Sequence, residues 1–403
     1  MRGKPRSRPP SGLVRAVLLL AVLLLSSRAD PAAARELRRQ MPFLRPLLMG
    51  DAYVAVGDES SSLLYNPAGL ARLKEGTIEV SPLHFGADRE LTGVLLDSDA
   101  VQSKYNNLTL AKLKDLVGTS LYYDVSLRLP FITATGQGAA YGIGAESMGA
   151  AEVVLDSLDL PAIQLELFVD ETALWSFFGQ YGDLSLGITG KVINRVGIDK
   201  TIGVATLFAS GGVLDLENDP DYVALTQGKA KTRTGLDLGM IYQFPGAENW
   251  QPRLGISVLN LGQRDSKRGF VGIEFGAVPD PETPPLYGRL PLIASIGFAV
   301  SPTFASVRYT FALDLVDLGR TAIPGKSLAT RSRVGFEIGV GPHDDGTALF
   351  SVLFGWNATH VGVGILSRVT IFEIGFGRYT VEKGEHPGDN PEERRVLLIA
   401  FRF

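Results

Sequence analysis

From residue 76 to the end of the chain, hydrophobic and polar residues alternate with a period of two. The stretch TRTGLDLGMIYQF (232–244) shows this pattern, and RSRVGFEIGVG (331–341) and TIFEIGFGRY (370–379) repeat it. Because successive side chains of a strand point to opposite faces, the alternation predicts β-strands with one apolar face. In 232–244 the apolar face carries Thr234, Leu236, Leu238, Met240, Tyr242 and Phe244, and the other carries Arg233, Gly235, Asp237, Gly239 and Gln243.

The pattern predicts about fourteen strands. They lie near 76–86, 120–133, 139–148, 163–180, 184–194, 232–244, 250–261, 290–300, 304–315, 332–341, 347–357, 359–366, 368–379 and 394–403. Long connections (87–119, 195–231, 262–289, 316–331 and 380–393) alternate with short ones such as 134–138, 180–183 and 301–304. Outer-membrane barrels show this asymmetry. Two regions stay open: 149–180 could hold one bent strand or two, and 357–368 leaves room only for a very short outer loop.

The first 34 residues have the composition of a secretory signal. Basic residues precede AVLLLAVLLL (16–25), and cleavage is expected after Ala29 or Ala34. The alternative is a membrane anchor, but the apolar run is shorter than the roughly 18–20 residues that a spanning helix needs. We therefore expect a signal peptide at 1–34, a short segment at 35–75 and a barrel at 76–403.

Composition narrows the class of protein. Hydrophobic residues make up 45% of the chain and charged residues 20%, yet no later run is long enough for a spanning helix. Only helices and closed barrels satisfy their backbone polar groups in lipid, so this combination predicts an all-β transmembrane barrel. A soluble sandwich would show the same alternation with its apolar face inward. The net charge of −4 gives no reason to expect a nucleic-acid partner.

The last ten residues, RRVLLIAFRF, form one more alternating stretch. Leu397, Ile399, Phe401 and Phe403 share a face, and the chain ends on an aromatic residue. This ending resembles the signal that the bacterial outer-membrane assembly machinery reads. Phe401 and Phe403 are thus the predicted assembly signal, although the glycine usual earlier in that signal is missing.

The segment SSSLLYNPAGL (60–70) interrupts the chain just before the first strand. Asp58 could cap a short helix over 59–65, and Asn66 could cap the next turn with Pro67 at its first position. Ala68 and Gly69 keep that turn small. We expect a compact hatch inside the barrel, with the hatch motif Asn66, Pro67, Ala68 and Gly69, and with a ligand path along Leu63, Leu64 and Tyr65.

The segments GDAYVAVGD (50–58) and YNPAGLA (65–71) carry a family resemblance. They resemble the FadL family of outer-membrane transporters (the OMPP1/FadL/TodX type) and its PorV-like relatives. The likeness in motif covers about 30 residues. It implies a Gram-negative outer-membrane barrel with an N-terminal hatch, passing hydrophobic compounds such as long-chain fatty acids or aromatic hydrocarbons by diffusion without a cofactor. The expected partners are membrane lipid, a hydrophobic ligand and the assembly machinery. The alternative is a PorV-like scaffold that binds a partner protein in secretion or surface assembly.

Candidate chemistry adds little to this interpretation. The chain has no cysteine, its four histidines lack zinc spacing, and it contains no nucleophile elbow, so we expect no metal, cofactor or enzymatic activity. Charges on the polar faces are nearly balanced, which suits ion-paired anchoring of an internal plug better than a selective ion pore. They are Arg128, Lys191, Arg233, Arg253, Arg308, Arg333 and Arg402 against Glu146, Asp237, Asp314, Glu337 and Glu373.

Overall fold

The computed structural model describes residues 43–73, 76–88, 120–136, 139–155, 162–203, 231–246, 249–265, 290–319, 327–341, 348–357, 360–382 and 391–403. The expected signal peptide and the long connections fall mainly outside these residues. The helical elements are α2 (Leu44–Leu48), α3 (Ser62–Tyr65), the 3-10 helix η1 (Pro67–Arg72) and α9 (Leu328–Arg331). The strands are β1 (Thr77–Asp88), β2 (Ser120–Gly136), β3 (Ala139–Leu155), β4 (Ala162–Tyr181), β5 (Leu184–Gly203), β6 (Lys231–Gln243), β7 (Arg253–Asp265), β8 (Ile293–Val300), β9 (Thr303–Phe304), β10 (Val307–Leu315), β11 (Ser332–Val340), β12 (Phe350–Asn357), β13 (His360–Val369), β14 (Phe372–Glu382) and β15 (Pro391–Arg402).

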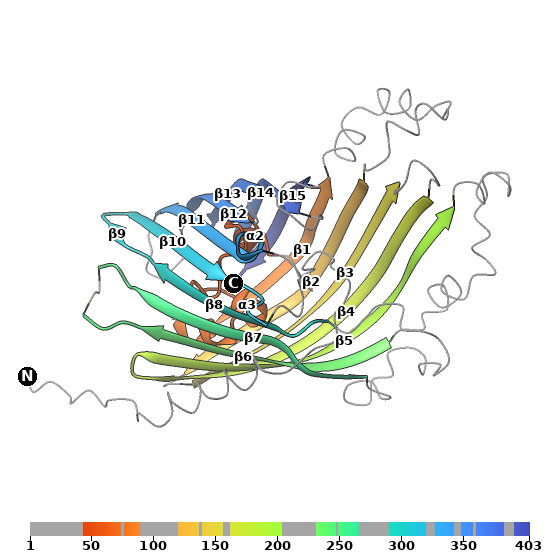
Figure 1. Cartoon of the computed structure of the whole chain (residues 1–403). Coiled ribbons are helices and arrows are strands. Elements are labelled where there is room, and N and C mark those ends of the chain that lie inside the picture. The colour runs from red at the N-terminus through yellow and green to blue at the C-terminus, as the bar shows by residue number, and fades with distance from the viewer. Residues whose placement is uncertain are drawn as a thin grey trace, which may run out of the picture.

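The strands form one closed antiparallel sheet (Figure 1). Neighbours in sequence pair with each other, β15 pairs with β1, and the β10–β11 pairing completes the ring. The all-β barrel class expected from the sequence is confirmed. The strand count differs from the expected fourteen, because the described residues form a sheet of 15 strands. The additional strand, β9, is only two residues long, pairs with β10 alone, and lies where the sequence predicts a turn (301–304).

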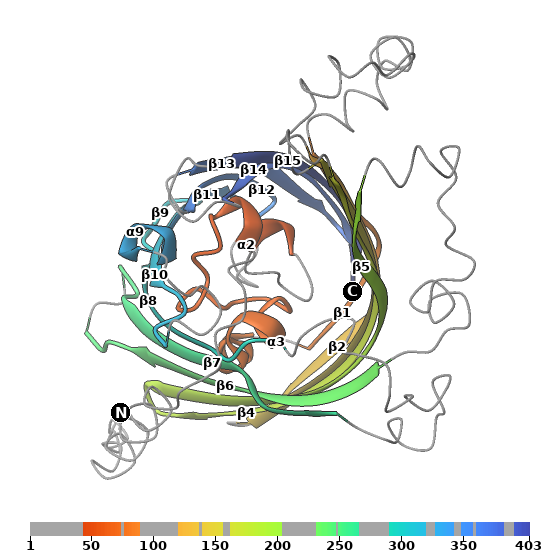
Figure 2. The same ribbon diagram turned by 45° about the vertical axis from the view of Figure 1, so that its right-hand side comes forward.

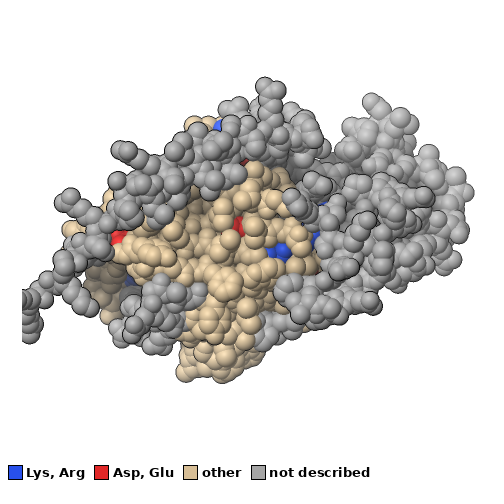
Figure 3. Space-filling model, turned by 90° about the horizontal axis from the view of Figure 1, so that it is seen from below, with Lys and Arg blue, Asp and Glu red and all other residues tan. Residues whose placement is uncertain are grey.

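The wall of the barrel is apolar outside and mostly polar or small inside. On β10, Phe311 and Leu313 are 43% and 48% exposed, while Thr310, Ala312 and Asp314 between them are buried. Described atoms on the barrel's underside are mostly neither acidic nor basic (Figure 3). An apolar outer face with polar residues inward is the pattern of a barrel that spans a membrane, and it is opposite to that of a soluble sandwich.

Strand ends refine the predicted boundaries. The region 149–180 holds the end of β3 and one long strand, β4, rather than two strands. β5 runs to Gly203 and pairs with β4 along its whole length, so the predicted loop start at 195 is wrong. The very short connection between β12 and β13 is as expected, with only 358–359 between them.

Two neighbouring strands carry bulges. Between Arg128 and Ile132, β2 has one residue more than β3, and β1 has one more than β15 between Val80 and Leu83. Pro130 and Pro82 fall within these intervals, where a residue without an N–H is tolerated. The β2 bulge leaves both Arg128 and Phe131 buried inside the barrel.

Residues 43–73, which we call the hatch, lie inside the ring of strands (Figure 2). Between Phe43 and Leu70 every residue except Asp51 and Asp58 is buried. The segment therefore lies inside the barrel, where the sequence predicts it, and its role as a hatch stays a prediction. In the described part of the chain, no helix has the length and apolar character needed to cross a membrane.

Candidate functional site

The hatch motif folds as the sequence predicts. Asn66 caps η1: its side-chain oxygen accepts a hydrogen bond from the backbone N–H of Ala68 at 3.2 Å, and Pro67 occupies the first helical position. The side-chain nitrogen of Asn66 donates to the carbonyl of Val54 at 2.7 Å and to that of Met240 on β6 at 3.2 Å. One side chain thus caps the turn and ties it both to the rest of the hatch and to the wall.

The predicted role of Asp58 as a helix cap is wrong. The helix α3 begins later, at Ser62, and its N-cap residue Ser61 makes no side-chain capping bond. Asp58 instead accepts hydrogen bonds from Arg45 at 2.5 Å and from the Tyr53 hydroxyl at 3.2 Å. The aspartate reaches a guanidinium brought in by α2, and this long-range ion pair wins over a local cap.

The three residues of the expected ligand path are buried in the centre of the hatch. Leu63 is 0%, Leu64 8% and Tyr65 2% exposed. The Tyr65 hydroxyl donates to Asp51 at 2.9 Å, and its ring packs edge-on against Tyr53 with centroids 5.5 Å apart. These side chains belong to the apolar core of the lumen; their role as a ligand path stays a prediction.

That apolar core joins the hatch to the wall. Phe43 packs edge-on against Phe131 of β2 with ring centroids 6.0 Å apart, and the guanidinium of Arg128 lies 3.8 Å from the centre of the Phe43 ring. The core contains, from the hatch, Phe43, Leu44, Leu48, Met49, Ala52, Tyr53, Ala55, Val56, Leu63, Leu64, Tyr65 and Leu70, and from the wall Phe131, Leu174, Phe178, Leu353, Leu366, Val396 and Leu398 among others. This part of the described lumen is therefore apolar, and buried charges lie elsewhere in it.

Lumen-facing glycines let the hatch backbone approach the wall closely. A Cβ built on Gly355 of β12 would lie 2.0 Å from the backbone nitrogen of Gly50. One on Gly187 of β5 would lie 2.4 Å from the carbonyl carbon of Pro67, and one on Gly255 of β7 2.4 Å from the carbonyl oxygen of Val54. Real Cβ atoms do not come this close to backbone, so only glycine fits. We call Gly187, Gly239, Gly255, Gly335 and Gly355 the glycine seat.

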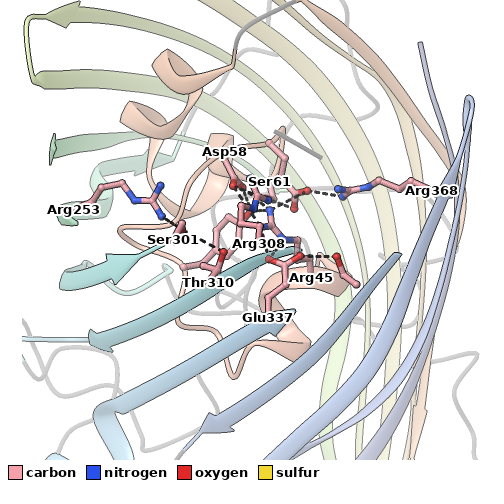
Figure 4. Close-up of polar contacts among 12 residues, drawn as sticks. Arg45, Asp58, Ser61, Arg253, Ser301, Arg308, Thr310, Glu337 and Arg368 are labelled. Atoms are coloured by element: carbon pink, nitrogen blue, oxygen red, sulfur yellow. Dashed lines mark hydrogen bonds and ion pairs between the residues drawn. The ribbon is translucent and has the colours of Figure 1, made fainter. Parts of the chain in front are cut away.

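Arg45 is the electrostatic centre of the site (Figure 4). Although α2 is apolar around it, the arginine is only 4% exposed. Its guanidinium contacts Glu337 of β11 at 2.6 Å and Asp58 at 2.5 Å, and it donates to the Tyr53 hydroxyl at 2.8 Å. Ser351 of β12 donates to the other oxygen of Glu337 at 2.8 Å. Arg45 therefore ties two parts of the hatch to two strands.

Glu59 extends the ion pairs to three more strands. Its carboxylate lies 3.5 Å from Arg45, 2.7 Å from Arg368 of β13 and 3.9 Å from Arg402 of β15. Arg402 contacts Glu79 of β1 at 3.1 Å. Each of these wall residues stands near the end of its strand where the short turns lie, as do Glu337 and Ser351. The ion pairs therefore hold the hatch at the short-turn end of the barrel.

Burial and charge pull the pKa values of the hatch in opposite directions. Burial raises the pKa of Glu59, but Arg45, Arg368 and Arg402 outweigh it and lower that pKa to about 2. The same competition, won by Arg45 and Arg308, holds the pKa of Asp58 well below its usual range. Burial lowers the pKa of Arg45, and its three carboxylate neighbours raise it further than burial lowers it. Asp58 and Glu59 are therefore ionised at neutral pH.

A second buried polar cluster lies on β1, β2 and β3. His84 Nε2 is 3.6 Å from Asp124, and Arg128 Nε donates to Glu146 at 3.2 Å. Sequence reasoning expected Arg128 and Glu146 to face the lumen, and both are buried there. Among the described residues no group of histidine and acidic side chains is arranged to hold a metal ion.

Sequence reasoning missed the two features that hold the hatch. Arg45 stands in the apolar stretch LRPLL. A single charged residue among apolar ones is the feature of the sequence that could have indicated a buried ion pair here. Of the glycines of the seat, Gly239 and Gly335 were predicted on the polar faces of their strands, yet nothing in the strand pattern says what approaches them. Phe401 is part of the β14–β15 and β15–β1 pairings, and Phe403 exchanges backbone hydrogen bonds with Ile78 at 2.8 and 2.9 Å. The two aromatics thus lie where the first strand, β1, pairs with the last strand, β15.

Comparison with known proteins does not assign this chain to a family. No family model matches the chain, and no curated protein matches it. Among solved structures, a deletion mutant of the TodX monoaromatic hydrocarbon channel is 11% identical, with a TM-score of 0.48, over 90% of this chain and 97% of that one. The CymD monoaromatic hydrocarbon channel is 14% identical, with a TM-score of 0.44, over 89% and 96%. A Pseudomonas aeruginosa FadL homologue is 12% identical, with a TM-score of 0.44, over 92% and 99%. Values this low describe a general likeness and carry no conclusion about function.

Proposed function

We propose that this protein is an outer-membrane channel for the passive uptake of hydrophobic small molecules, such as long-chain fatty acids or aromatic hydrocarbons. The observation that carries the proposal is the buried N-terminal hatch inside a closed barrel with an apolar outer face. A ring of this size is wider than one its own side chains can fill, so an empty lumen would leak. A hatch closes it to polar solutes.

The chemistry of the lumen supports a hydrophobic solute. A porin passes polar solutes through a water-filled, polar interior. Here Phe43, Leu48, Leu63 and Leu70 make an apolar centre together with Phe131 of the wall. An apolar molecule gains free energy by entering such surroundings, whereas a polar one loses its hydration there without new hydrogen bonds.

One observation favours a second candidate, a PorV-like scaffold for a partner protein. Buried ion pairs and close backbone contacts at the glycine seat hold the hatch firmly, which also suits a lumen that stays filled. The two candidates differ in whether anything passes the hatch.

A measurement of uptake distinguishes the channel from the scaffold. Cells that express the protein in the outer membrane should take up a radiolabelled long-chain fatty acid or an aromatic hydrocarbon faster than cells without it. Deleting residues 42–70 should leave an inserted barrel that is leaky to small polar solutes in a liposome-swelling assay. Equal uptake across the whole panel, with the protein correctly inserted, would reject the channel and favour the scaffold. A truncated barrel as tight as the full chain would show that the segment is not a hatch.

A further inference from the structure

Three arginines lie in one region at the short-turn end of the lumen: Arg72 of η1, Arg253 of β7 and Arg308 of β10. Arg253 and Arg308 lie in the same region as Asp58 (Figure 4). Arg253 interacts electrostatically with Arg72, Arg308 and Asp58, so the four charges share one region. Asp58 is already committed to Arg45 at 2.5 Å, and Arg308 reaches its other oxygen at 3.5 Å. The region therefore holds more positive charge than its own carboxylate neutralises.

Arg253 has no carboxylate partner among the described residues. It is only 1% exposed, and its one hydrogen bond runs from Nη2 to the hydroxyl of Ser301 at 2.5 Å. Its Nε has no acceptor in the part of the chain that the structure describes. A buried guanidinium without a counter-charge is unfavourable, because its charge and donors lose water and gain too little in return.

Arg72 repeats this situation from the hatch side. Its Nη1 donates a long hydrogen bond of 3.4 Å to the Gln243 side chain, and its Nε also lacks an acceptor among the described residues. Arg72 itself is only half-buried, so part of this residue is open to solvent.

We propose that Arg72, Arg253 and Arg308 form a binding site for an anion with at least two oxygen atoms, a carboxylate or a phosphate. Guanidinium groups present paired N–H donors whose spacing fits such an anion, and these hydrogen bonds are stronger when both partners are charged. The hydroxyls of Ser301 and Thr310 lie 3.3 Å apart beside Arg253. One donates to the other, which leaves one hydroxyl hydrogen as an additional donor. The anion supplies the negative charge and the acceptors that Nε of Arg253 and Nε of Arg72 lack.

Two sources could supply this chemistry: the carboxylate head of an amphipathic solute, or a phosphate group, free or on a lipid. Binding of inorganic phosphate, acetate and octanoate to the purified full chain in a non-ionic detergent should be measured by calorimetry at constant chloride. We expect saturable binding of at least one of them. Octanoate binding more tightly than acetate identifies an amphipathic carboxylate, and phosphate binding alone identifies a phosphate source.

Substitutions test the assignment. Arg253→Gln and Arg72→Gln should each weaken that binding at least tenfold, which corresponds to about 1.4 kcal/mol. The matched control is Arg378→Gln, whose side chain on β14 is 60% exposed, and binding should be unchanged. Gel mobility before and after heating reports whether each variant has assembled into a folded barrel. If Arg253→Gln does not assemble, binding to the Arg72→Gln variant tests the proposal. No saturable binding of any probe, or binding unaltered in an assembled arginine variant, overturns the proposal. The measurement is of binding, so it stands apart from whether the protein transports anything.

Discussion

Arg45 of the hatch and Glu337 of β11 are 292 residues apart in sequence and form a buried ion pair, with Nε and Nη2 of the arginine 3.0 and 2.6 Å from the same carboxylate oxygen. Both side chains are at most 3% exposed. The pair joins the segment that enters the lumen to the wall that encloses it. Because neither charge has access to water, each depends on the other to remain buried.

Replacing Arg45 by methionine should release the hatch while leaving the barrel intact. The change leaves Asp58 and Glu337 buried without their main counter-charge, and breaking a buried pair costs about 3–5 kcal/mol. We expect increased conductance in planar lipid bilayers and faster proteolysis within residues 43–73. Arg378→Met, at an exposed pair with Glu393, is the control and should change neither quantity. Wild-type conductance and protection in Arg45→Met would mean that other contacts hold the hatch.

Replacing Gly355 by alanine should displace the hatch by steric conflict. The new methyl group would lie 2.0 Å from the backbone nitrogen of Gly50, and backbone on both sides leaves little room to adjust. Overpacking of this kind costs about 1–3 kcal/mol. Hydrogen exchange at the hatch amides should become faster, while the heat-modifiable band of the folded barrel persists.

Gly362 on the next strand is the matched control for Gly355. A Cβ there would meet its nearest neighbour at 3.4 Å, an ordinary contact, so Gly362→Ala should keep wild-type exchange rates. Equal effects of the two substitutions would show that loss of glycine flexibility, and not the hatch contact, is responsible.

Asn66→Asp separates the two roles of the cap residue. Aspartate retains an oxygen to cap η1, but it loses the donor to Val54 and Met240 and places a charge beside their carbonyl oxygens. We expect it to destabilise the hatch at least as much as Asn66→Ala, which loses the cap and the donor together at a cost of about 1–2 kcal/mol. The rates of proteolysis within the hatch show which of the two variants is destabilised more. If Asn66→Asp matched wild type, the capping bond alone would account for the role of Asn66.

Acid should open the hatch over a definite range. Glu59 has its pKa lowered from 4.5 to about 2 in the folded protein, so its ionised form is favoured by folding. A lowered folded pKa gives stability that is fully present above the unfolded pKa and lost as pH falls through the folded one. The leak conductance should therefore rise between about pH 4.5 and pH 2. Glu59→Gln should shift part of this rise to neutral pH; a pH-independent leak in the wild type would contradict the coupling.

Phe403→Ala should reduce assembly in cells without destabilising the assembled barrel. The side chain is 61% exposed, so its removal costs little packing, and the backbone bonds to Ile78 are retained. We expect a smaller heat-modifiable fraction in outer membranes but an unchanged melting temperature of the purified protein. Phe304→Ala removes a comparably exposed aromatic, 58%, away from the C-terminus and is the control. Equal loss in both variants would remove the reason to assign Phe403 a signalling role.

Local physics explains what could be predicted from the sequence alone. The period-two alternation predicts strands and assigns Phe311 and Leu313 to one face and Asp314 to the other, because side-chain direction in a strand depends only on position. The Asn66–Pro67 turn follows from capping, which involves residues two apart. A high content of apolar residues without a spanning helix predicts a barrel, because only helices and closed barrels satisfy their backbone polar groups in lipid.

Only the tertiary structure decides what meets inside the barrel. Asp58 is suited to cap the following helix, but the folding of the hatch brings Arg45 to it, and a buried charge pair outweighs a local cap. Gly355 lies in a predicted strand (347–357), yet its need for glycine arises only because the backbone of Gly50, 305 positions earlier in the printed sequence, lies against it. Arg253 was predicted to point inward, but that it lacks a carboxylate partner among the described residues depends on how three separate elements converge. Contacts between distant segments depend on how the closed sheet brings them together. The alternation of apolar and polar residues along the chain carries no information about these contacts.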